Sequence, residues 1–284
     1  MNILNGKEVS NTIKENLRKE ILEYKEKYNT KPRMVIIQVG RDAASNIYIK
    51  NKLKACEEVG IKTNYNHLSE DTSEKELIEL IEFYNKKENI EGIIVQTPLP
   101  EHIDYKNIIK VIDPKKDVDG FHSDNMGRTA LGLDGIKPAT ALGVKLLLEH
   151  YEIDWTSKDI VVIGRGLHVG LPIAIMLGDD ERGTVTSCHK NTKDLKEKTL
   201  NADIIICAVG KENLLTEDMV KEGVIIIDVG INRNSDGKIC GDVDFDNVKN
   251  KASYISPVPG GVGPMTVVSL LYNTFWAYKD KYEG

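Results

Sequence analysis

The chain has 284 residues, of which 40% are hydrophobic and 29% are charged, and its formal net charge is −6. This length is enough for about two domains that each bury a core. The acidic balance, without a long run of Lys and Arg, argues against nucleic acid or an anionic membrane as the main partner.

Three further features of the sequence indicate the cellular compartment of the protein and whether it binds metal. The four cysteines include no C-x-x-C pair and the N-terminus has no signal-peptide pattern, so we expect a cytoplasmic protein with reduced thiols. No apolar run approaches the roughly 20 residues that span a bilayer. The six histidines have no H-x-x-x-H or H-E-x-x-H spacing, and no metal site is expected.

The first part of the chain predicts an α/β lobe. Helical apolar spacing predicts helices over 9–28 and 45–59 and a third that Thr72 or Ser73 caps, while buried runs predict strands at 34–40 and 91–96. The turn at 41–44 lacks the glycines of a nucleotide-binding turn. This lobe is therefore not expected to bind a dinucleotide.

One lysine interrupts the apolar face of the helix predicted over 45–59. Lys52 falls in the middle of an arc formed by Tyr48, Ile49, Leu53, Ala55, Cys56 and Val59. In one interpretation the stem of Lys52 packs on the core while its amine reaches water. In the other, partial desolvation lowers the pKa of the amine and makes it a usable acid or base. The pattern alone favours the first interpretation, and favours Tyr48 as an aromatic core residue.

Two further polar residues stand where the chain leaves regular structure. Gln96 ends the strand predicted over 91–96, and ligands of open α/β sheets bind beyond the carboxyl ends of strands. Its alternative role is to cap the loop with its amide. Asp119 lies in the run 113–120, whose residues favour a solvated turn, although its carboxylate could instead accept hydrogen bonds from an amino-heterocycle in a cleft.

A Gly-rich connector leads into a second lobe. Thr140 is predicted to cap a helix, and we place the boundary near Ala139, with a first domain over 1–139 and a second over 140–265. Many prolines and glycines predict a rigid loop over 257–264. Thr266 is then predicted to cap a C-terminal helix, 266–284, that returns to the first lobe.

The segment 159–172 has the pattern of a phosphate-binding turn. Four apolar residues predict a buried parallel strand, and the run G-x-G-x-x-x-G at Gly164, Gly166 and Gly170 leads into a helix. The spacing is one residue longer than the common fingerprint, and alone it fits an ordinary strand-to-helix turn equally well. Further strand runs at 184–188, 203–210 and 223–230 favour a doubly wound, Rossmann-type parallel sheet.

Basic residues favour NADP over NAD as the cofactor. His189 and Lys190 directly follow the strand predicted over 184–188. An NAD site usually has an acidic residue at this position, which binds a ribose hydroxyl. With Arg165 in the turn, they suit a 2′-phosphate. We also predict cofactor contacts at Gly164, Gly166, Val209, Gly210 and Ile231.

Several motifs occur together in this order along the chain: Ser45-x-x-Tyr48-x-x-x-Lys52, Gln96-x-Pro98-Leu99-Pro100, Lys116-Asp117-Val118-Asp119-Gly120, Gly164-Arg165 and Pro257 to Thr266. In this combination they resemble the bifunctional methylenetetrahydrofolate dehydrogenase/methenyltetrahydrofolate cyclohydrolase (FolD) family. The resemblance runs over essentially the whole chain. It implies NADP-dependent oxidation of 5,10-methylenetetrahydrofolate to 5,10-methenyltetrahydrofolate, hydrolysis of that product to 10-formyltetrahydrofolate, and a homodimer.

The same resemblance implies roles for individual residues. Lys52 would be the central catalytic group, Tyr48 would stack on the folate, Gln96 would assist Lys52 and Asp119 would bind the pterin. These implied roles outweigh the structural interpretations that pattern alone favours. The substrate is also expected to contact Pro259, Gly260 and Gly261.

Three departures from the family pattern bear on function. Gly166 stands where the family usually has Ser, which removes a phosphate ligand, and Pro138-Ala139-Thr140-Ala141 replaces the usual Pro-Cys-Thr-Pro. The position of Lys190 varies within the family. The alternatives left open are a monofunctional dehydrogenase, a nucleotide-sensing regulator and an oxidoreductase similar to shikimate dehydrogenase. The retained Lys52 argues against the first two, and the loop 257–264 against the third.

Overall fold

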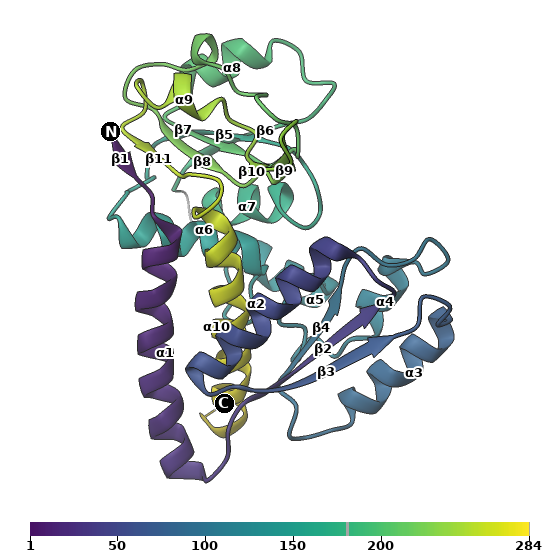
Figure 1. Cartoon of the computed structure of the whole chain (residues 1–284). Helices are drawn as coiled ribbons and strands as arrows, with labels where there is room; N and C mark the ends of the chain where they lie inside the picture. The colour runs from purple at the N-terminus through teal and green to yellow at the C-terminus, as the bar shows by residue number, and fades with distance from the viewer. Residues whose placement is uncertain (180–181, 284) are drawn as a thin grey trace. The chain divides into compact units, whose positions relative to one another are not determined.

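The computed structural model describes residues 1–179 and 182–283, and the chain divides into two compact units. The six-stranded unit comprises Met1–Asn11, Thr129–Leu133 and Thr140–Thr266. The three-stranded unit comprises Thr12–Arg128, Asp134–Ala139 and Val267–Gly284. Two long helices, α1 (Gly6–Tyr28) and α10 (Val262–Glu283), contribute residues to both units (Figure 1).

The sheet of the three-stranded unit is parallel throughout and has the order β3 (Lys62–Leu68), β2 (Arg33–Val39), β4 (Gly92–Gln96). The central strand β2 is apolar on both faces, as expected of a strand that helices cover on each side. Val35 and Ile37 pack in one cluster with residues of α3 (Glu74–Asn85) and α4 (Tyr105–Val111). On the other face, the Thr274 hydroxyl of α10 lies 3.5 Å from the Met34 sulfur.

Local capping signals set the helix ends in this unit. Helix α2 (Ala43–Val59) begins two residues before the predicted start because the Asp42 carboxylate accepts the N–H of Ser45 at 2.6 Å. It ends at Gly60, whose φ of +88° suits a residue without a Cβ. Helix α3 begins with a capping box of Ser73 and Glu76, which confirms Ser73 as the N-cap.

The larger sheet has the order β1-β11-β8-β7-β5-β6, and every neighbouring pair is parallel. Its bounds are β5 (Asp159–Ile163), β6 (Thr184–Cys188), β7 (Ile204–Cys207), β8 (Ile225–Asp228), β11 (Tyr254–Ile255) and β1 (Asn2–Ile3). The chain adds β6 on one side of β5 and β7 on the other. The strand order therefore reverses between β5 and β7, which is where open α/β sheets bind ligands. This confirms the predicted Rossmann-type sheet.

The first residues of the chain join this larger sheet. Asn2 and Ile3 pair in parallel with Tyr254 and Ile255, so residues 1–11 group with the six-stranded unit rather than with the lobe to which the sequence assigned them. Pairing across so long a stretch of chain leaves no local pattern in the sequence.

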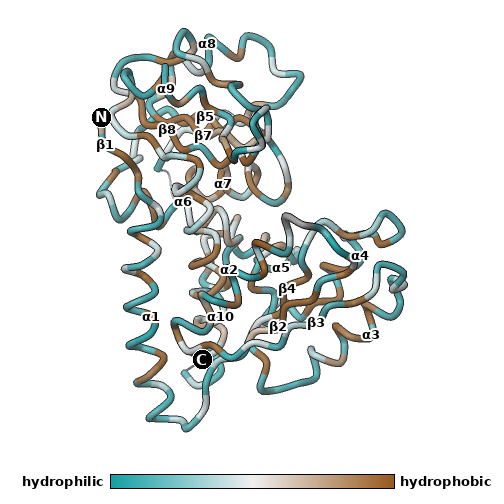
Figure 2. Tube along the Cα trace, in the orientation of Figure 1, coloured by the Kyte–Doolittle hydropathy of each residue, from teal (hydrophilic) through white to brown (hydrophobic). Residues whose placement is uncertain are grey.

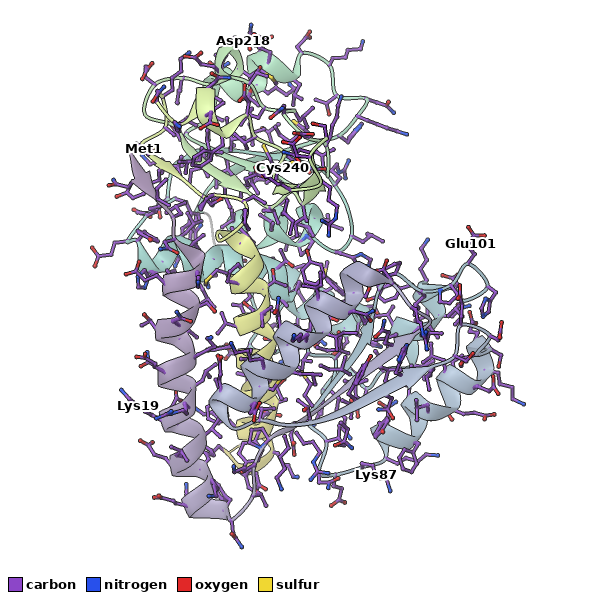
Figure 3. All side chains as sticks on the ribbon, in the orientation of Figure 1. Met1, Lys19, Lys87, Glu101, Asp218 and Cys240 are labelled. Carbon is purple, nitrogen blue, oxygen red and sulfur yellow. The ribbon has the colours of Figure 1, made fainter. Side chains whose placement is uncertain are left out.

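Helices cover the larger sheet. They are α6 (Ala139–His150), α7 (Gly170–Leu177), α8 (Leu195–Asn201) and α9 (Phe245–Val248). The remaining elements are α5 (Ser123–Ala130), the 3-10 helix η2 (Glu217–Met219) and a hairpin of β9 (Asn232–Arg233) and β10 (Ile239–Cys240). Figure 2 shows apolar residues concentrated along inner strands such as β2, β5 and β7. Charged side chains such as Lys19 on α1, Lys87 after α3 and Asp218 in η2 point outward (Figure 3).

Two predicted helix caps are wrong. Helix α6 begins at Ala139, directly after a proline, and α10 begins at Val262, so Thr140 and Thr266 lie inside the helices and not at the N-caps. The early start of α10 is possible because a proline in the first turn, here Pro264, lacks only an N–H that has no helical partner. The Thr266 hydroxyl instead donates to Thr140 Oγ1 at 3.2 Å.

No helix within residues 1–179 and 182–283 is long and apolar enough to cross a membrane. All four cysteines are free thiols.

A buried asparagine on α10 holds the segment that follows α4. The Asn273 side chain is 1% exposed, and its amide donates to the carbonyl oxygens of Val118 and Lys137, both at 2.8 Å. Those two carbonyls flank Asp119 in space, because the Ala139 N–H donates to the Asp119 carbonyl at 3.0 Å.

We predict that Asn273→Ala lowers the free energy of unfolding by about 1–3 kcal/mol, since it removes two hydrogen bonds that a buried amide donates. Denaturant unfolding of the purified variant measures this loss. Asn51→Ala, which removes an exposed amide from α2, serves as the control and should not lower stability. Equal stability of both variants would contradict the assigned role of Asn273.

Candidate active site

Lys52 lies buried in the three-stranded unit. Helix α2 directs it from the apolar face toward the end of β4, and its side chain is only 9% exposed. The Nζ atom donates a hydrogen bond to Gln96 Oε1 at 3.0 Å. The two residues that the sequence singled out on separate elements are therefore in direct contact.

The amide of Gln96 has a defined orientation. Its Nε2 donates to the carbonyl oxygen of Thr97 at 2.7 Å, which leaves Oε1 facing the lysine. The same carbonyl accepts the Ser45 hydroxyl at 3.3 Å, so the start of α2 and the end of β4 share one acceptor. Gln96 thus presents an acceptor, and not a donor, to Lys52.

Burial lowers the pKa of the Lys52 amine, because a charged ammonium loses its hydration in this position. The negative charge of Asp119 acts in the opposite direction and raises the pKa, as does, to a smaller extent, the electrostatic interaction with the Cys56 side chain. Cys56 lies one turn further along α2, and burial raises the pKa of its thiol to about 12. The net effect is a lysine that gives up its proton more readily than an exposed one.

Asp119 follows a segment that pairs with the edge of the smaller sheet. Ile93 of β4 bridges to Asp117, and the Ile93 N–H donates to the Lys116 carbonyl at 2.7 Å. This pairing places the half-buried Asp119 near the carboxyl end of the sheet, within electrostatic range of Lys52. Tyr105 belongs to the same group: burial raises the pKa of its hydroxyl, and the charges of Asp119 and Asp117 raise it further.

Asp117 is fully buried and fixes the turn that carries Asp119. Its carboxylate accepts the backbone N–H groups of Gly120 at 3.2 Å and His122 at 2.7 Å, and the Asn125 amide at 3.0 Å. Burial raises the pKa of Asp117 to about 6, although these hydrogen bonds oppose the shift. The predicted solvated turn is therefore wrong for Asp117, which the surrounding donors hold inside the protein.

Tyr48 is half-buried on α2, one turn before Lys52 and on the same face. The sequence missed a second polar residue at this edge, Gln38 of β2, which pairs in register with Gln96. Gln38 is 2% exposed, accepts the Tyr65 hydroxyl at 2.6 Å and donates to Asn46 at 3.0 Å. A Gln at or next to the last residue of a buried strand was the available signal, as it was for Gln96.

The glycine-rich turn of the six-stranded unit has two glycines that local geometry requires. Gly164 has a φ of +110°, and a Cβ there would collide with the Ala208 carbonyl oxygen. A Cβ on Gly170 would collide with the Gly164 carbonyl oxygen. Gly166 has open space around it, so its lack of a side chain is not a steric requirement of the turn.

The predicted cofactor residues gather at the carboxyl edge of the larger sheet. Arg165 and Gly166 follow β5, His189 and Lys190 follow β6, and Val209 and Gly210 follow β7, all of them exposed. Ile231 follows β8 and is 50% exposed. Leu167, at 59% exposed, and Val209, at 46%, add apolar surface at this edge, where the start of α7 has an apolar Val169 as its N-cap.

The loop 257–261 belongs to the six-stranded unit, whereas Lys52, Gln96, Asp119 and Tyr48 belong to the other. The Gly260 carbonyl accepts the Lys7 N–H at 3.0 Å. Gly6 packs closely on Gly261, and a Cβ added to Gly6 would collide with the Gly261 carbonyl oxygen. Pro259 is exposed. Among the described residues, no group of three or more His, Cys, Asp or Glu side chains could hold a metal ion.

Comparison with protein families matches both parts of the chain. The profile described as "Tetrahydrofolate dehydrogenase/cyclohydrolase, catalytic domain" matches residues 4–119. The profile described as "Tetrahydrofolate dehydrogenase/cyclohydrolase, NAD(P)-binding domain" matches residues 138–282. A bifunctional protein FolD of Aquifex aeolicus is 50% identical over 281 residues, covering 99% of this chain and 96% of the relative.

Solved structures give the same result. The bifunctional FolD enzyme of Campylobacter jejuni is 50% identical with a TM-score of 0.96, and the match covers 99% of both chains. The FolD of Trypanosoma brucei, complexed with NADP and an inhibitor, is 32% identical with a TM-score of 0.94, over 99% of this chain and 98% of that one. A shikimate dehydrogenase of Aquifex aeolicus, 15% identical with a TM-score of 0.53 and covering 90% of this chain and 94% of its own, shares the fold alone.

The contrast between the first two glycines of the turn gives a paired prediction. Gly164→Ala should lower the free energy of unfolding by about 2 kcal/mol or more, because a Cβ there meets a backbone carbonyl and the φ is strained. Gly166→Ala should change it by less than about 0.5 kcal/mol. Thermal unfolding of the two variants side by side measures the difference, and equal losses would contradict the geometry described for this turn.

Proposed function

The chain belongs to the tetrahydrofolate dehydrogenase/cyclohydrolase family, and we propose that it catalyses both reactions of the family name. It oxidises 5,10-methylenetetrahydrofolate to 5,10-methenyltetrahydrofolate with NADP and hydrolyses the product to 10-formyltetrahydrofolate. The observation that carries the hydrolytic half is the buried Lys52 amine bonded to the Gln96 amide oxygen. A monofunctional dehydrogenase would not need this pair.

The residues of the six-stranded unit fit a dinucleotide phosphate. Gly164 and Gly170 allow the tight turn after β5, and Val169 leaves the start of α7 without a side-chain cap, so that end can face an anion. We assign the 2′-phosphate to Arg165, His189 and Lys190, and apolar contact with the cofactor to Val209 and Ile231. When bound, NADP accepts the hydride of the dehydrogenase step.

In hydrolysis, water adds to the one-carbon bridge of methenyltetrahydrofolate and the bond from that carbon to N5 breaks. The carbon stays on N10 as a formyl group, one proton of the water ends on N5, and the other leaves to solvent. We assign the movement of these protons to Lys52, because burial lowers the pKa of its amine, which makes the ammonium a better proton donor and leaves a base once the proton is released. Gln96 holds the amine in place through its oriented oxygen.

Substrate recognition is assigned to the residues around this pair. The carboxylate of Asp119 can accept hydrogen bonds from the amino-heterocycle of the pterin, and Tyr48 offers an aromatic face on the same side of α2 as Lys52. Pro259, Gly260 and Gly261 are proposed to contact the substrate from their rigid loop. In the dehydrogenase step these groups orient the bridge carbon, while the substrate's own nitrogen stabilises the cation that forms.

We further propose that the enzyme is a cytoplasmic homodimer whose partners are small anionic ligands and not nucleic acid. The net charge of −6 and the family resemblance support this assignment. Light scattering of the purified chain tests the dimer.

We predict that Lys52→Met lowers the rate of methenyltetrahydrofolate hydrolysis by roughly 10²- to 10⁴-fold, the range expected for loss of a general acid or base. NADP reduction with methylenetetrahydrofolate should fall much less, since hydride transfer needs no proton shuttle. Lys54→Met, on the exposed side of α2, is the matched control. Comparable losses of both activities in Lys52→Met would show that Lys52 mainly shapes the pocket.

A second prediction concerns the cofactor. Lys190→Asp should weaken NADP binding by about tenfold or more while changing NAD binding much less, because the new carboxylate repels the 2′-phosphate that NAD lacks. Lys193→Asp, three residues further along and also exposed, controls for the change in net charge. Steady-state KM values for both cofactors measure the effect, and an equal change for the two would discard the assignment of Lys190.

A further inference from the structure

A fully buried carboxylate lies behind the cofactor edge of the six-stranded unit. Asp242 is 0% exposed, and one of its oxygens, Oδ2, accepts the backbone N–H groups of Val209 at 2.7 Å and Gly210 at 3.1 Å. The other oxygen, Oδ1, accepts the Lys211 N–H at 2.8 Å and the Asn232 side-chain amide at 2.9 Å. Three consecutive backbone N–H groups therefore converge on one side chain.

Such a run of N–H groups is the kind of concavity that proteins use to bind external anions. Here an internal carboxylate fills it, so the loop after β7 is folded around Asp242. Gly210 has a φ of +77°, which gives the loop the curvature to do so. The same loop presents the exposed Val209, and its Ala208 carbonyl packs on Gly164 of the turn after β5.

A second buried carboxylate holds Asp242 in position. Asp228, at the end of β8 and 3% exposed, accepts the N–H groups of Gly230, Asp242 and Val243 at 2.9–3.0 Å. The Asp228 N–H donates to Ser256 Oγ at 2.8 Å, directly before the loop 257–261. One connected set of buried polar residues thus ties together the segments that carry Val209, Gly210, Ile231 and the Pro-Gly loop.

We propose that Asp242 is a positioning residue for the cofactor, which sets the loops after β7 and β8 in their binding conformation before NADP arrives. This inference rests on the proposed function only for the identity of the ligand. The position requires a side chain that accepts hydrogen bonds at both of its outer atoms, because two donors face each oxygen of Asp242. An asparagine would turn an NH₂ group toward two N–H donors in either orientation of its amide, which loses two hydrogen bonds and opens the loop.

The test compares Asp242→Asn with the parent enzyme in three measurements. Equilibrium binding of NADP should weaken by about tenfold or more. The KM for NADP in the dehydrogenase assay should rise accordingly, while hydrolysis of methenyltetrahydrofolate, assayed without NADP, should fall by a much smaller factor. Hydrogen exchange at the amides of residues 209–211 should become faster, since their acceptor is lost.

Asp203→Asn is the matched control, because Asp203 accepts the Asp159 N–H at 2.9 Å beside the opposite, amino-terminal ends of β5 and β7. It should leave NADP binding unchanged. If Asp242→Asn does not fold, Asn232→Ala removes a single donor to the same carboxylate, and NADP binding should then weaken by about threefold.

Unchanged NADP affinity in a folded Asp242→Asn variant, or hydrolysis that falls in parallel with the dehydrogenase, would overturn the proposal. The second result would mean that Asp242 serves general stability. Failure of the proposed function looks different: the parent enzyme would then bind NADP without turning over the folate, or would not bind NADP at all.

Discussion

The proposed chemistry depends on one interaction, the hydrogen bond between the buried Lys52 amine and the Gln96 amide oxygen. Taking an ammonium group out of water is costly, and proteins reduce that cost by releasing the proton or by supplying acceptors. Gln96 supplies an acceptor without a charge, so it fixes the amine but restores little of its affinity for a proton. A carboxylate in the same place would have kept the lysine charged, whereas Asp119 acts from further away and only partly offsets burial.

Each unit fixes its functional loops by the same physical means. In the three-stranded unit the Asp117 carboxylate gathers backbone N–H groups of the turn that carries Asp119, and in the six-stranded unit Asp242 does so for the loop after β7. A carboxylate has several acceptor positions and no donors, so it suits a loop whose N–H groups point inward. The loops can remain irregular and exposed at the ligand side while their buried side is fully hydrogen-bonded.

The sequence predicted those features that depend on local pattern. Runs of β-branched residues located buried strands such as β2 and β5, the glycine spacing located the turn at Gly164, and the helical wheel placed Lys52 on a buried face. The mostly polar strand β3 has no such run and was not predicted. The sequence could not predict contacts between distant segments, such as Asn2 with Tyr254 or Asp242 with Val209. Such contacts leave no repeating pattern of residues in the sequence. The caps assigned to Thr140 and Thr266 failed because a capping residue type does not show how early a helix can begin. The roles of Lys52, Gln96, Asp119 and Tyr48 came from family resemblance and remain predictions.

The central claim is that Lys52 releases its proton more readily than an ordinary lysine. Carbon-13 NMR of the enzyme with labelled lysine, titrated with pH, measures this directly, and the Lys52 signal is identified by its absence from the spectrum of Lys52→Met. We predict a titration midpoint for Lys52 clearly below the value of about 10.4 found for lysine in peptides. A midpoint at or above that value would contradict it.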